Sequence, residues 1–208
     1  MSNLTLYVDA QYTSPWAMAV FVMLKEKQLP FELKTVDLNA GAQHAPAFVK
    51  QSLTHRIPTL VHGDFSLSES TAICEYLEEA FPNTKRVLPA DIHARARTRQ
   101  VQGFVRTDMA ALRSERSTET IFFAPATTPL SKDAQAAAEK LIAFAEALLP
   151  NGADHLFGAW SIADTDLAVM LLRISNSGGF LPQRIDAYVK KQWAHPAVQE
   201  WCAFERRR

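Results

Sequence analysis

Residues 57–77 read IPTLVHGDFSLSESTAICEYL, and this stretch decides the fold of the first half of the chain. Two short runs of strand-forming residues, 57–61 and 65–68, flank His62-Gly63-Asp64, which is typical of a tight hairpin turn. A helix is predicted from about Glu69 to Phe81, because apolar residues recur there at helical spacing and a proline ends the pattern. The stretch therefore predicts a β-hairpin followed by a helix.

The residues before this hairpin predict a strand, a helix and a second strand. Residues 4–8 and residues 31–36 both alternate and are rich in strand formers. Between them, Ser14-Pro15 is a favourable helix start, and the apolar run from Trp16 to Leu24 follows it. The order strand, helix, strand predicts a right-handed crossover with parallel pairing. Together with the hairpin this is a βαβ unit followed by a ββα unit, the layout of a thioredoxin-like domain over residues 1–82.

The second half of the chain predicts helices only. Residues 83–94 are polar and suit an interdomain linker, and helical stripes of apolar residues recur from there to the end. Ser161-Ile162-Ala163-Asp164 is a capping box with Asp at the third helical position, which predicts a buried central helix starting at Ile162. The predicted fold class is α/β plus all-α, with an N-terminal thioredoxin-like domain and an all-helical domain over residues 95–208.

Composition excludes several classes of function. The 208 residues contain 22 Lys and Arg against 22 Asp and Glu, so no net positive charge attracts nucleic acid or an anionic membrane. Only Cys74 and Cys202 are present, which argues against a disulfide framework and favours a reducing compartment. The six histidines show no metal-ligand spacing, so no metal is expected. The first residues lack the pattern of a secretory signal, and we expect a cytoplasmic protein without nucleic-acid or membrane partners.

Ser14 is the first candidate for chemistry. A hydroxyl at a helix start can donate a hydrogen bond to a thiolate while the helix dipole adds positive potential, and both effects lower the pKa of a thiol. The same serine is also a favoured N-cap, so the position has a purely structural interpretation. Tyr12 and Thr13 are neighbouring hydroxyls that can take the same role, and Tyr7 is a more distant one.

The hairpin stretch carries two further candidates. If the Ile57–Pro58 bond is cis, the backbone N–H and C=O of Ile57 face an expected ligand groove, and an extended peptide can pair with them. The low frequency of cis bonds before proline favours trans. Glu69-Ser70 lies at a helix start, where Ser70 can bind a carboxylate and Glu69 an ammonium group; capping is the simpler interpretation of both. His44 and Arg56 lie in loops that we expect to face the same groove.

With Ser14, Pro58 and Glu69-Ser70 in this order and a helical domain behind them, the chain resembles the glutathione S-transferase family. Residues 157–164, which read FGAWSIAD, and residues 195–198, which read HPAV, are similar to segments of the family's helical domain. The resemblance extends over nearly the whole chain.

The resemblance implies glutathione as co-substrate and a role for each candidate. Ile57, with Pro58 behind it, would pair with the cysteinyl backbone, and Glu69 and Ser70 would take the γ-glutamyl end. His44 and Arg56 would lie near the glycine carboxylate. Ser14 matches the hydroxyl of the serine-type transferases, which resemble the theta and zeta classes.

Two departures narrow the activity that the resemblance implies. No cysteine occupies the first loop, which excludes a thiol–disulfide mechanism of the omega or beta kind at that position. Thr13-Ser14-Pro15-Trp16 only partly matches the zeta motif. The expected reaction is attack of a glutathione thiolate on an electrophile, or reduction of an organic hydroperoxide, by a homodimer. A glutathione-dependent isomerase and a non-catalytic binding or assembly module remain the alternatives.

Overall fold

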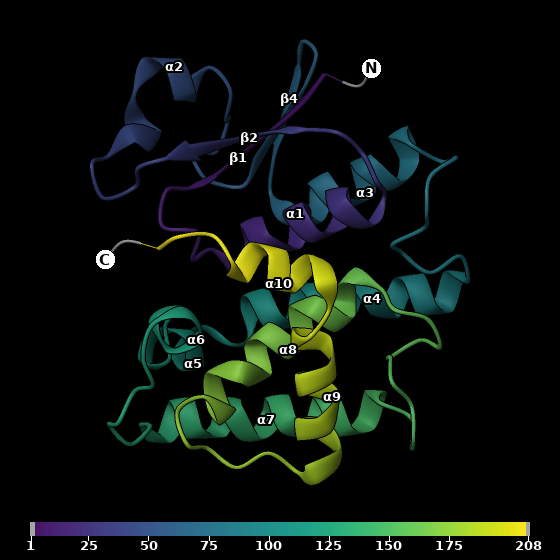
Figure 1. Ribbon diagram of the computed structural model, residues 1–208. Helices are drawn as coiled ribbons and strands as arrows, with labels where there is room; N and C mark the ends of the chain where they lie inside the picture. Colours follow the sequence, from purple (N-terminus) through teal and green to yellow (C-terminus); the bar gives the residue numbers. More distant parts are fainter. Residues whose placement is uncertain (1–2, 207–208) are drawn as a thin grey trace. The chain divides into compact units, whose positions relative to one another are not determined.

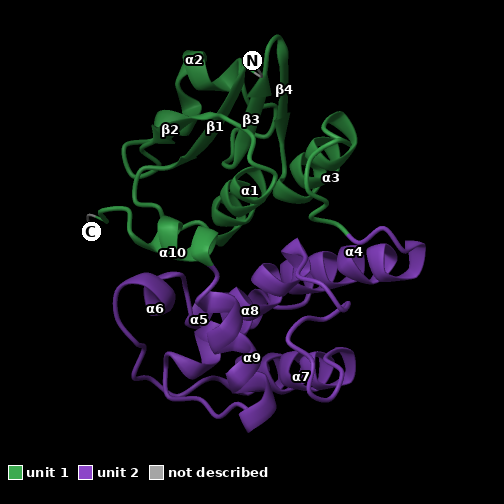
Figure 2. Cartoon of the chain, turned by 45° about the vertical axis from the view of Figure 1, so that its right-hand side comes forward, with its two compact units in different colours: residues 1–88, 196–208 green, residues 89–195 purple. Residues whose placement is uncertain are grey.

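The computed structural model describes residues 3–206 and consists of two compact units. The first unit comprises residues 1–88 and 196–208, and the second unit comprises residues 89–195 (Figure 2). Residues 1–2 of the predicted N-terminal domain and residues 207–208 of the predicted helical domain lie outside the described part. The predicted class, a thioredoxin-like domain followed by a helical domain, is confirmed (Figure 1).

A four-stranded mixed sheet forms the centre of the first unit, with the strand order β2-β1-β3-β4. The first crossover is parallel, as predicted, since β1 and β2 pair in parallel, whereas β1 with β3 and β3 with β4 pair antiparallel. The strands are β1 (Leu4–Asp9), β2 (Glu32–Val36), β3 (Thr59–His62) and β4 (Phe65–Ser68). The predicted hairpin is therefore β3–β4, with Gly63 in its turn at a φ of 60°.

Helices cover both faces of this sheet. The alternation of β1 sends Leu6 and Val8, both fully buried, to one face. The helices α1 (Pro15–Glu26) and α3 (Ser70–Ala80) lie together on one face, below the sheet in Figure 2. The opposite face carries Tyr7, whose ring meets Phe48 of the short helix α2 (Pro46–Val49) edge-on at 5.7 Å. The short 3₁₀ helix η1 (Ala42–His44) precedes α2.

The predicted linker begins inside the first unit. Val87 is buried, and its N–H donates to the Glu78 carboxylate of α3 at 3.2 Å. The same carboxylate forms a buried ion pair with Lys27 at 3.2 Å, and the Lys27 ammonium also donates to the Lys85 carbonyl at 3.2 Å. These contacts hold the first part of the predicted linker against α1 and α3.

The second unit is helical throughout its regular structure. Its helices are α4 (Ile92–Thr107), α5 (Ala110–Glu115), α6 (Glu119–Phe122), α7 (Lys132–Leu148), α8 (Ile162–Ser175) and α9 (Gln183–Trp193). Every residue of α8 from Ile162 to Ile174 is buried, as its continuous apolar run predicts. The capping-box carboxylate of Asp164 accepts from the Ser161 N–H at 2.9 Å and so closes the start of this central helix.

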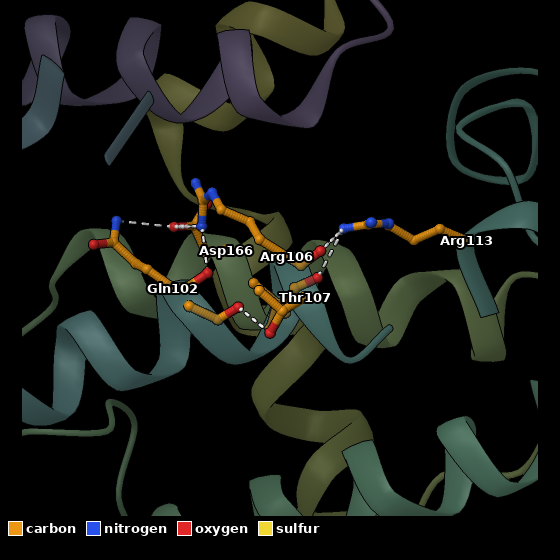
Figure 3. A network of polar contacts seen from close by, with 7 residues as sticks. Gln102, Arg106, Thr107, Arg113 and Asp166 are labelled. Atoms are coloured by element: carbon orange, nitrogen blue, oxygen red, sulfur yellow. Dashed lines mark hydrogen bonds and ion pairs between the residues drawn. The ribbon is translucent and has the colours of Figure 1, made fainter. Parts of the chain in front are cut away.

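A polar network joins α4 to α8 within this unit (Figure 3). The buried Asp166 carboxylate accepts from the Gln102 amide at 3.1 Å and from the Arg106 guanidinium at 3.4 Å. Arg113 donates to the carbonyls of Val105 and Arg106 at 3.1 and 2.8 Å, which satisfies the C-terminal end of α4 (Figure 3). The network explains how charged side chains are accommodated beside a buried helix.

The end of the chain differs from the sequence expectation, which placed residues 95–208 in one helical domain. Helix α10 (Pro196–Cys202) and the residues after it belong to the first unit (Figure 2). Trp201 is fully buried there, with its ring 5.4 Å from that of Phe21 in α1. Aromatic packing on α1 therefore decides where this segment lies. Within residues 3–206, no helix has both the length and the apolar character needed to cross a bilayer.

Candidate functional site

The register of the sheet brings three of the predicted segments to one edge. Thr59, the first residue of β3, pairs with Tyr7 near the end of β1 and with Ser68 at the end of β4. The chain leaves β1 towards the start of α1, and it leaves β4 directly into α3. The starts of both helices and the Ile57–Pro58 bond, which precedes β3, therefore lie at the same edge of the sheet.

The Ile57–Pro58 peptide bond is cis. The loop before it is held by Arg56, whose carbonyl accepts from the Ser52 hydroxyl at 3.1 Å and from the Thr59 hydroxyl at 2.8 Å. Among residues 3–206 we find no hydrogen bond to the backbone N–H or C=O of Ile57. Because backbone polar groups are strong hydrogen-bonding groups, Ile57 offers a donor and an acceptor for an extended peptide at this edge.

Glu69 and Ser70 form the start of α3. Glu69 is exposed and has a φ of 73° and a ψ of 110°, a conformation that non-glycine residues seldom adopt. Such strain costs roughly 1–3 kcal/mol and clusters at ligand sites. Ser70 is the first residue of the helix and is 4% exposed. The pair thus combines an outward carboxylate with a helix N-terminus, a combination that suits an amino-acid end group.

The hydroxyls of the first loop have different partners. The Ser14 oxygen caps α1 by accepting from the Ala17 N–H at 3.2 Å, and no acceptor for its own hydrogen is found among the described residues. The Thr13 hydroxyl donates to the Asp9 carboxylate at 2.9 Å. The Tyr12 ring stacks on Phe204, with the ring centres 4.5 Å apart. Ser14 therefore keeps the capacity to donate, since a hydroxyl donates once and accepts twice.

A polar cavity of about 540 Å³ collects three of the predicted residues, His44, Arg56 and Ile57. Its other lining residues are Leu38, Gln43, Thr54 and His55. Its lining contains no acidic side chain and one permanently charged cation, Arg56, so it suits a carboxylate. Ser14, Glu69 and Ser70 do not line this cavity.

Sequence reasoning missed two residues of this region. His55 lines the cavity with its ring 6.5 Å from that of His44, and its φ of 53° marks a tight turn. Asp9, at the end of β1, is 2% exposed and accepts from the Thr13 N–H at 2.6 Å and from the Ser14 N–H at 3.1 Å. An aspartate after a buried strand and just before a helix start was the available signal, because Asp often bonds nearby backbone N–H groups.

The chemistry of these residues is that of peptide recognition. Unpaired backbone groups, helix starts and a guanidinium bind carboxylates and amides, and a serine hydroxyl at a helix start stabilises an anion. No group of three or more His, Cys, Asp or Glu residues able to hold a metal occurs in the described part of the chain.

Comparisons with known proteins point in the same direction. The family model described as "Glutathione S-transferase, N-terminal domain" matches residues 13–80, and the model described as "Glutathione S-transferase, C-terminal domain" matches residues 91–207. Glutathione S-transferase theta-2 from Homo sapiens is 36% identical over 102 residues, which are 49% of this chain and 41% of that protein. Glutathione S-transferase 1 from Dianthus caryophyllus is 39% identical over 101 residues, 49% of this chain and 45% of that protein. The chain thus spans less than half the length of these curated relatives.

A solved structure matches over a greater length. A glutathione transferase homolog from Burkholderia, crystallised with bound glutathione, is 43% identical and superimposes with a TM-score of 0.78. The match covers 96% of this chain and 95% of that one. With this structural match and a family model that covers more than half of the sequence, the chain belongs to the glutathione S-transferase family.

Proposed function

We propose that this chain is a glutathione transferase that binds glutathione at the edge of the sheet and uses its thiolate as a nucleophile. One observation carries the proposal. The register of β1, β3 and β4 brings the helix-capping Ser14, the N–H and C=O groups of Ile57 and the start of α3 to one edge of the sheet. An extended tripeptide with a carboxylate at each end and an ammonium group has matching chemistry.

In the proposed complex, glutathione lies as an added strand against Ile57. The Ile57 N–H and C=O pair with the backbone of the cysteinyl residue, since neither group has a hydrogen-bond partner among residues 3–206. The γ-glutamyl end lies at α3, where Glu69 binds the ammonium group and Ser70 the carboxylate. The glycine carboxylate enters the cavity lined by His44 and Arg56.

Thiol activation is assigned to Ser14. Its hydroxyl donates to the sulfur, and the N-terminus of α1 adds positive potential, so the thiolate is favoured over the thiol. Thr13 is a poorer candidate because its hydrogen is engaged by Asp9. Tyr12 is a poorer candidate because its ring packs on Phe204.

The thiolate then reacts in one of two ways. In conjugation, the sulfur forms a bond to an electrophilic carbon and a leaving group departs with its electron pair. In peroxide reduction, the sulfur attacks the terminal oxygen of an organic hydroperoxide, which yields an alcohol and a glutathione sulfenic acid that a second glutathione reduces. Both reactions require the thiolate of the bound glutathione.

Alanine variants test the proposal. Ser14→Ala should lower kcat at least about tenfold, because one hydrogen bond to a charged group contributes about 1.5–3 kcal/mol. Its affinity for glutathione, measured by calorimetry, should stay close to that of the wild type. Glu69→Ala and Ser70→Ala should each weaken glutathione binding about tenfold for the same reason.

The matched control for Ser14→Ala is Ser131→Ala, since Ser131 caps α7 in the second unit by accepting from the Ala134 N–H at 3.3 Å. Both variants lose an N-cap, so equal losses of activity would show that Ser14 acts only through stability. Unchanged turnover in Ser14→Ala would assign the thiol to Tyr12, Thr13 or backbone donors. Equal affinity in Glu69→Ala and Ser70→Ala would reject the γ-glutamyl assignment.

The rival functions separate by assay. Binding to glutathione-agarose together with turnover of chloro-dinitrobenzene or an organic hydroperoxide supports the transferase. Isomerisation of a maleyl substrate would favour the isomerase, and binding without any turnover would favour the non-catalytic module. The homodimer and the cytoplasmic location stay predictions. The first is measured by sedimentation equilibrium in an analytical ultracentrifuge and the second by cell fractionation.

A further inference from the structure

A buried carboxylate organises the loop that carries the Ser14 hydroxyl. One oxygen of Asp9 accepts from both the N–H and the hydroxyl of Thr13, at 2.6 and 2.9 Å, and the other accepts from the Ser14 N–H at 3.1 Å. Asp9 is only 2% exposed. Three donors from two adjacent residues thus converge on one side chain at the end of β1.

This arrangement determines where the Ser14 hydroxyl lies. Ser14 is held at two points, because its N–H donates to Asp9 while its side-chain oxygen accepts from the Ala17 N–H. Asp9 also engages the hydroxyl hydrogen of Thr13. The carboxylate therefore fixes one hydroxyl in place and removes its neighbour as a donor.

The end of the chain holds the same loop from its other side. The Arg206 guanidinium donates to the Tyr12 carbonyl at 3.2 Å, and it also donates to the carbonyls of Trp201 at 2.9 Å and Cys202 at 2.7 Å. The Tyr12 ring stacks on Phe204 and meets Trp201 edge-on at 5.7 Å. The backbone of Tyr12, with a φ of 52°, is thus held by a segment nearly 200 residues away in the sequence.

Charge complements this geometry. Burial lowers the pKa of Arg206, and a smaller Coulomb interaction with the Asp9 carboxylate acts to raise it. A buried carboxylate near a thiolate disfavours the anion, and the positive charge of Arg206 acts in the opposite direction.

We propose that Asp9 and Arg206 are positioning residues that clamp the loop over residues 12–14 and aim the Ser14 hydroxyl at the glutathione sulfur. The inference rests on the proposed function, since it assigns the support for the same thiol site. It makes the C-terminal segment part of the thiol-activating machinery of the first unit.

The test compares Asp9→Ala, Asp9→Asn and Arg206→Ala with the wild-type chain of 208 residues. The main readout is the pKa of the bound glutathione thiol, followed by thiolate absorbance in the ultraviolet as the pH is raised. For Asp9→Ala we expect this pKa to rise by about one unit, a tenfold change in the thiolate population. We expect kcat to fall about tenfold or more, because misplacing a reacting group by about 1 Å can cost as much as 10²-fold.

Asp9→Asn keeps the shape of the side chain and one acceptor oxygen, so its thiol pKa and kcat should lie between those of Asp9→Ala and the wild type. Arg206→Ala leaves every Asp9 hydrogen bond in place and should lower kcat about threefold. Glutathione affinity should change less than about threefold in all three variants, because the Ile57 and Glu69 contacts remain. These two milder variants keep the test decisive where Asp9→Ala fails to fold.

The matched control is Glu115→Ala in the second unit. The Glu115 carboxylate accepts from the N–H of Ser131 at 2.8 Å and from its hydroxyl, the same pair of donors that Asp9 accepts from Thr13. This variant loses similar bonds and should leave the bound-thiol pKa unchanged. A fall in kcat as large as that of Asp9→Ala would overturn the inference, since loss of stability alone would then explain both.

Amide hydrogen exchange in the ligand-free protein gives an independent arm. The Thr13 and Ser14 amides should be protected in the wild type and should exchange at least about tenfold faster in Asp9→Ala. Suppose that the wild type and the variants all bind glutathione. Amide exchange or a thiol pKa that is the same in the variants as in the wild type would then overturn the positioning role alone. A wild type that fails to bind glutathione would overturn the proposed function and the positioning role together.

Discussion

Asp164→Ala should cost the protein a large share of its stability. The Asp164 side chain is fully buried and accepts four hydrogen bonds: from the Leu156 N–H at 2.9 Å, the Ser161 N–H at 2.9 Å, the Ser161 hydroxyl at 3.1 Å and the Tyr188 hydroxyl at 3.0 Å. Burial raises the pKa of this carboxyl, and the four hydrogen bonds act in the opposite direction. Truncation leaves these donors buried without the carboxylate.

The expected loss follows from the donors. Each buried donor left unsatisfied costs about 1–3 kcal/mol, and two of the four are backbone N–H groups that cannot rotate to another partner. Relief of the buried charge offsets part of this cost. The net loss should be about 3–5 kcal/mol, which is large beside the total free energy of unfolding of an ordinary protein, about 5–15 kcal/mol.

Urea unfolding followed by circular dichroism measures the loss, with Tyr188→Phe as the comparison. That variant removes only one of the four donors and keeps the ring, so it should cost about 1 kcal/mol. The midpoint for Asp164→Ala should therefore fall well below that for Tyr188→Phe at an unchanged slope. Equal midpoints, or a loss below about 1 kcal/mol for Asp164→Ala, would refute the reasoning.

Two further predictions concern ion pairs and hydrogen bonds elsewhere. Lys27→Met should lower the free energy of unfolding by about 3–5 kcal/mol, because it leaves the buried Glu78 carboxylate without its cation. Adding Glu78→Leu should restore part of this loss in urea unfolding, since the Val87 N–H and the Lys85 carbonyl still lose their partners, and a double variant as unstable as the single one would contradict the prediction. The Ser131 hydroxyl and N–H lower the pKa of Glu115, so its contribution to stability is present above the ordinary Glu pKa of about 4.5 and is lost as the pH falls through the lower folded value. The difference in Tm between the wild type and Glu115→Gln should accordingly shrink as the pH falls from 7 towards 3, and a constant difference would argue against the link.

Features that depend on neighbouring residues were predictable from the sequence. The Ser14-Pro15 helix start and the Ser161-to-Asp164 capping box join groups three residues apart, and both form as predicted. The parallel crossover follows from the order of the elements and the handedness of the chain. The residues expected to bind glutathione were placed at strand and helix ends for the same reason, and their roles stay predictions.

Other features were decided only by the tertiary structure. Alternation and spacing could not tell which of three hydroxyls keeps a donor, because that depends on the bonds of Asp9 and on the packing of Phe204 against Tyr12. They also could not show that the last helix packs on α1, where the ring of Trp201 contacts that of Phe21. A cap or a turn is set by a few adjacent backbone dihedrals, whereas a contact across nearly 200 residues exists only once the whole chain has folded.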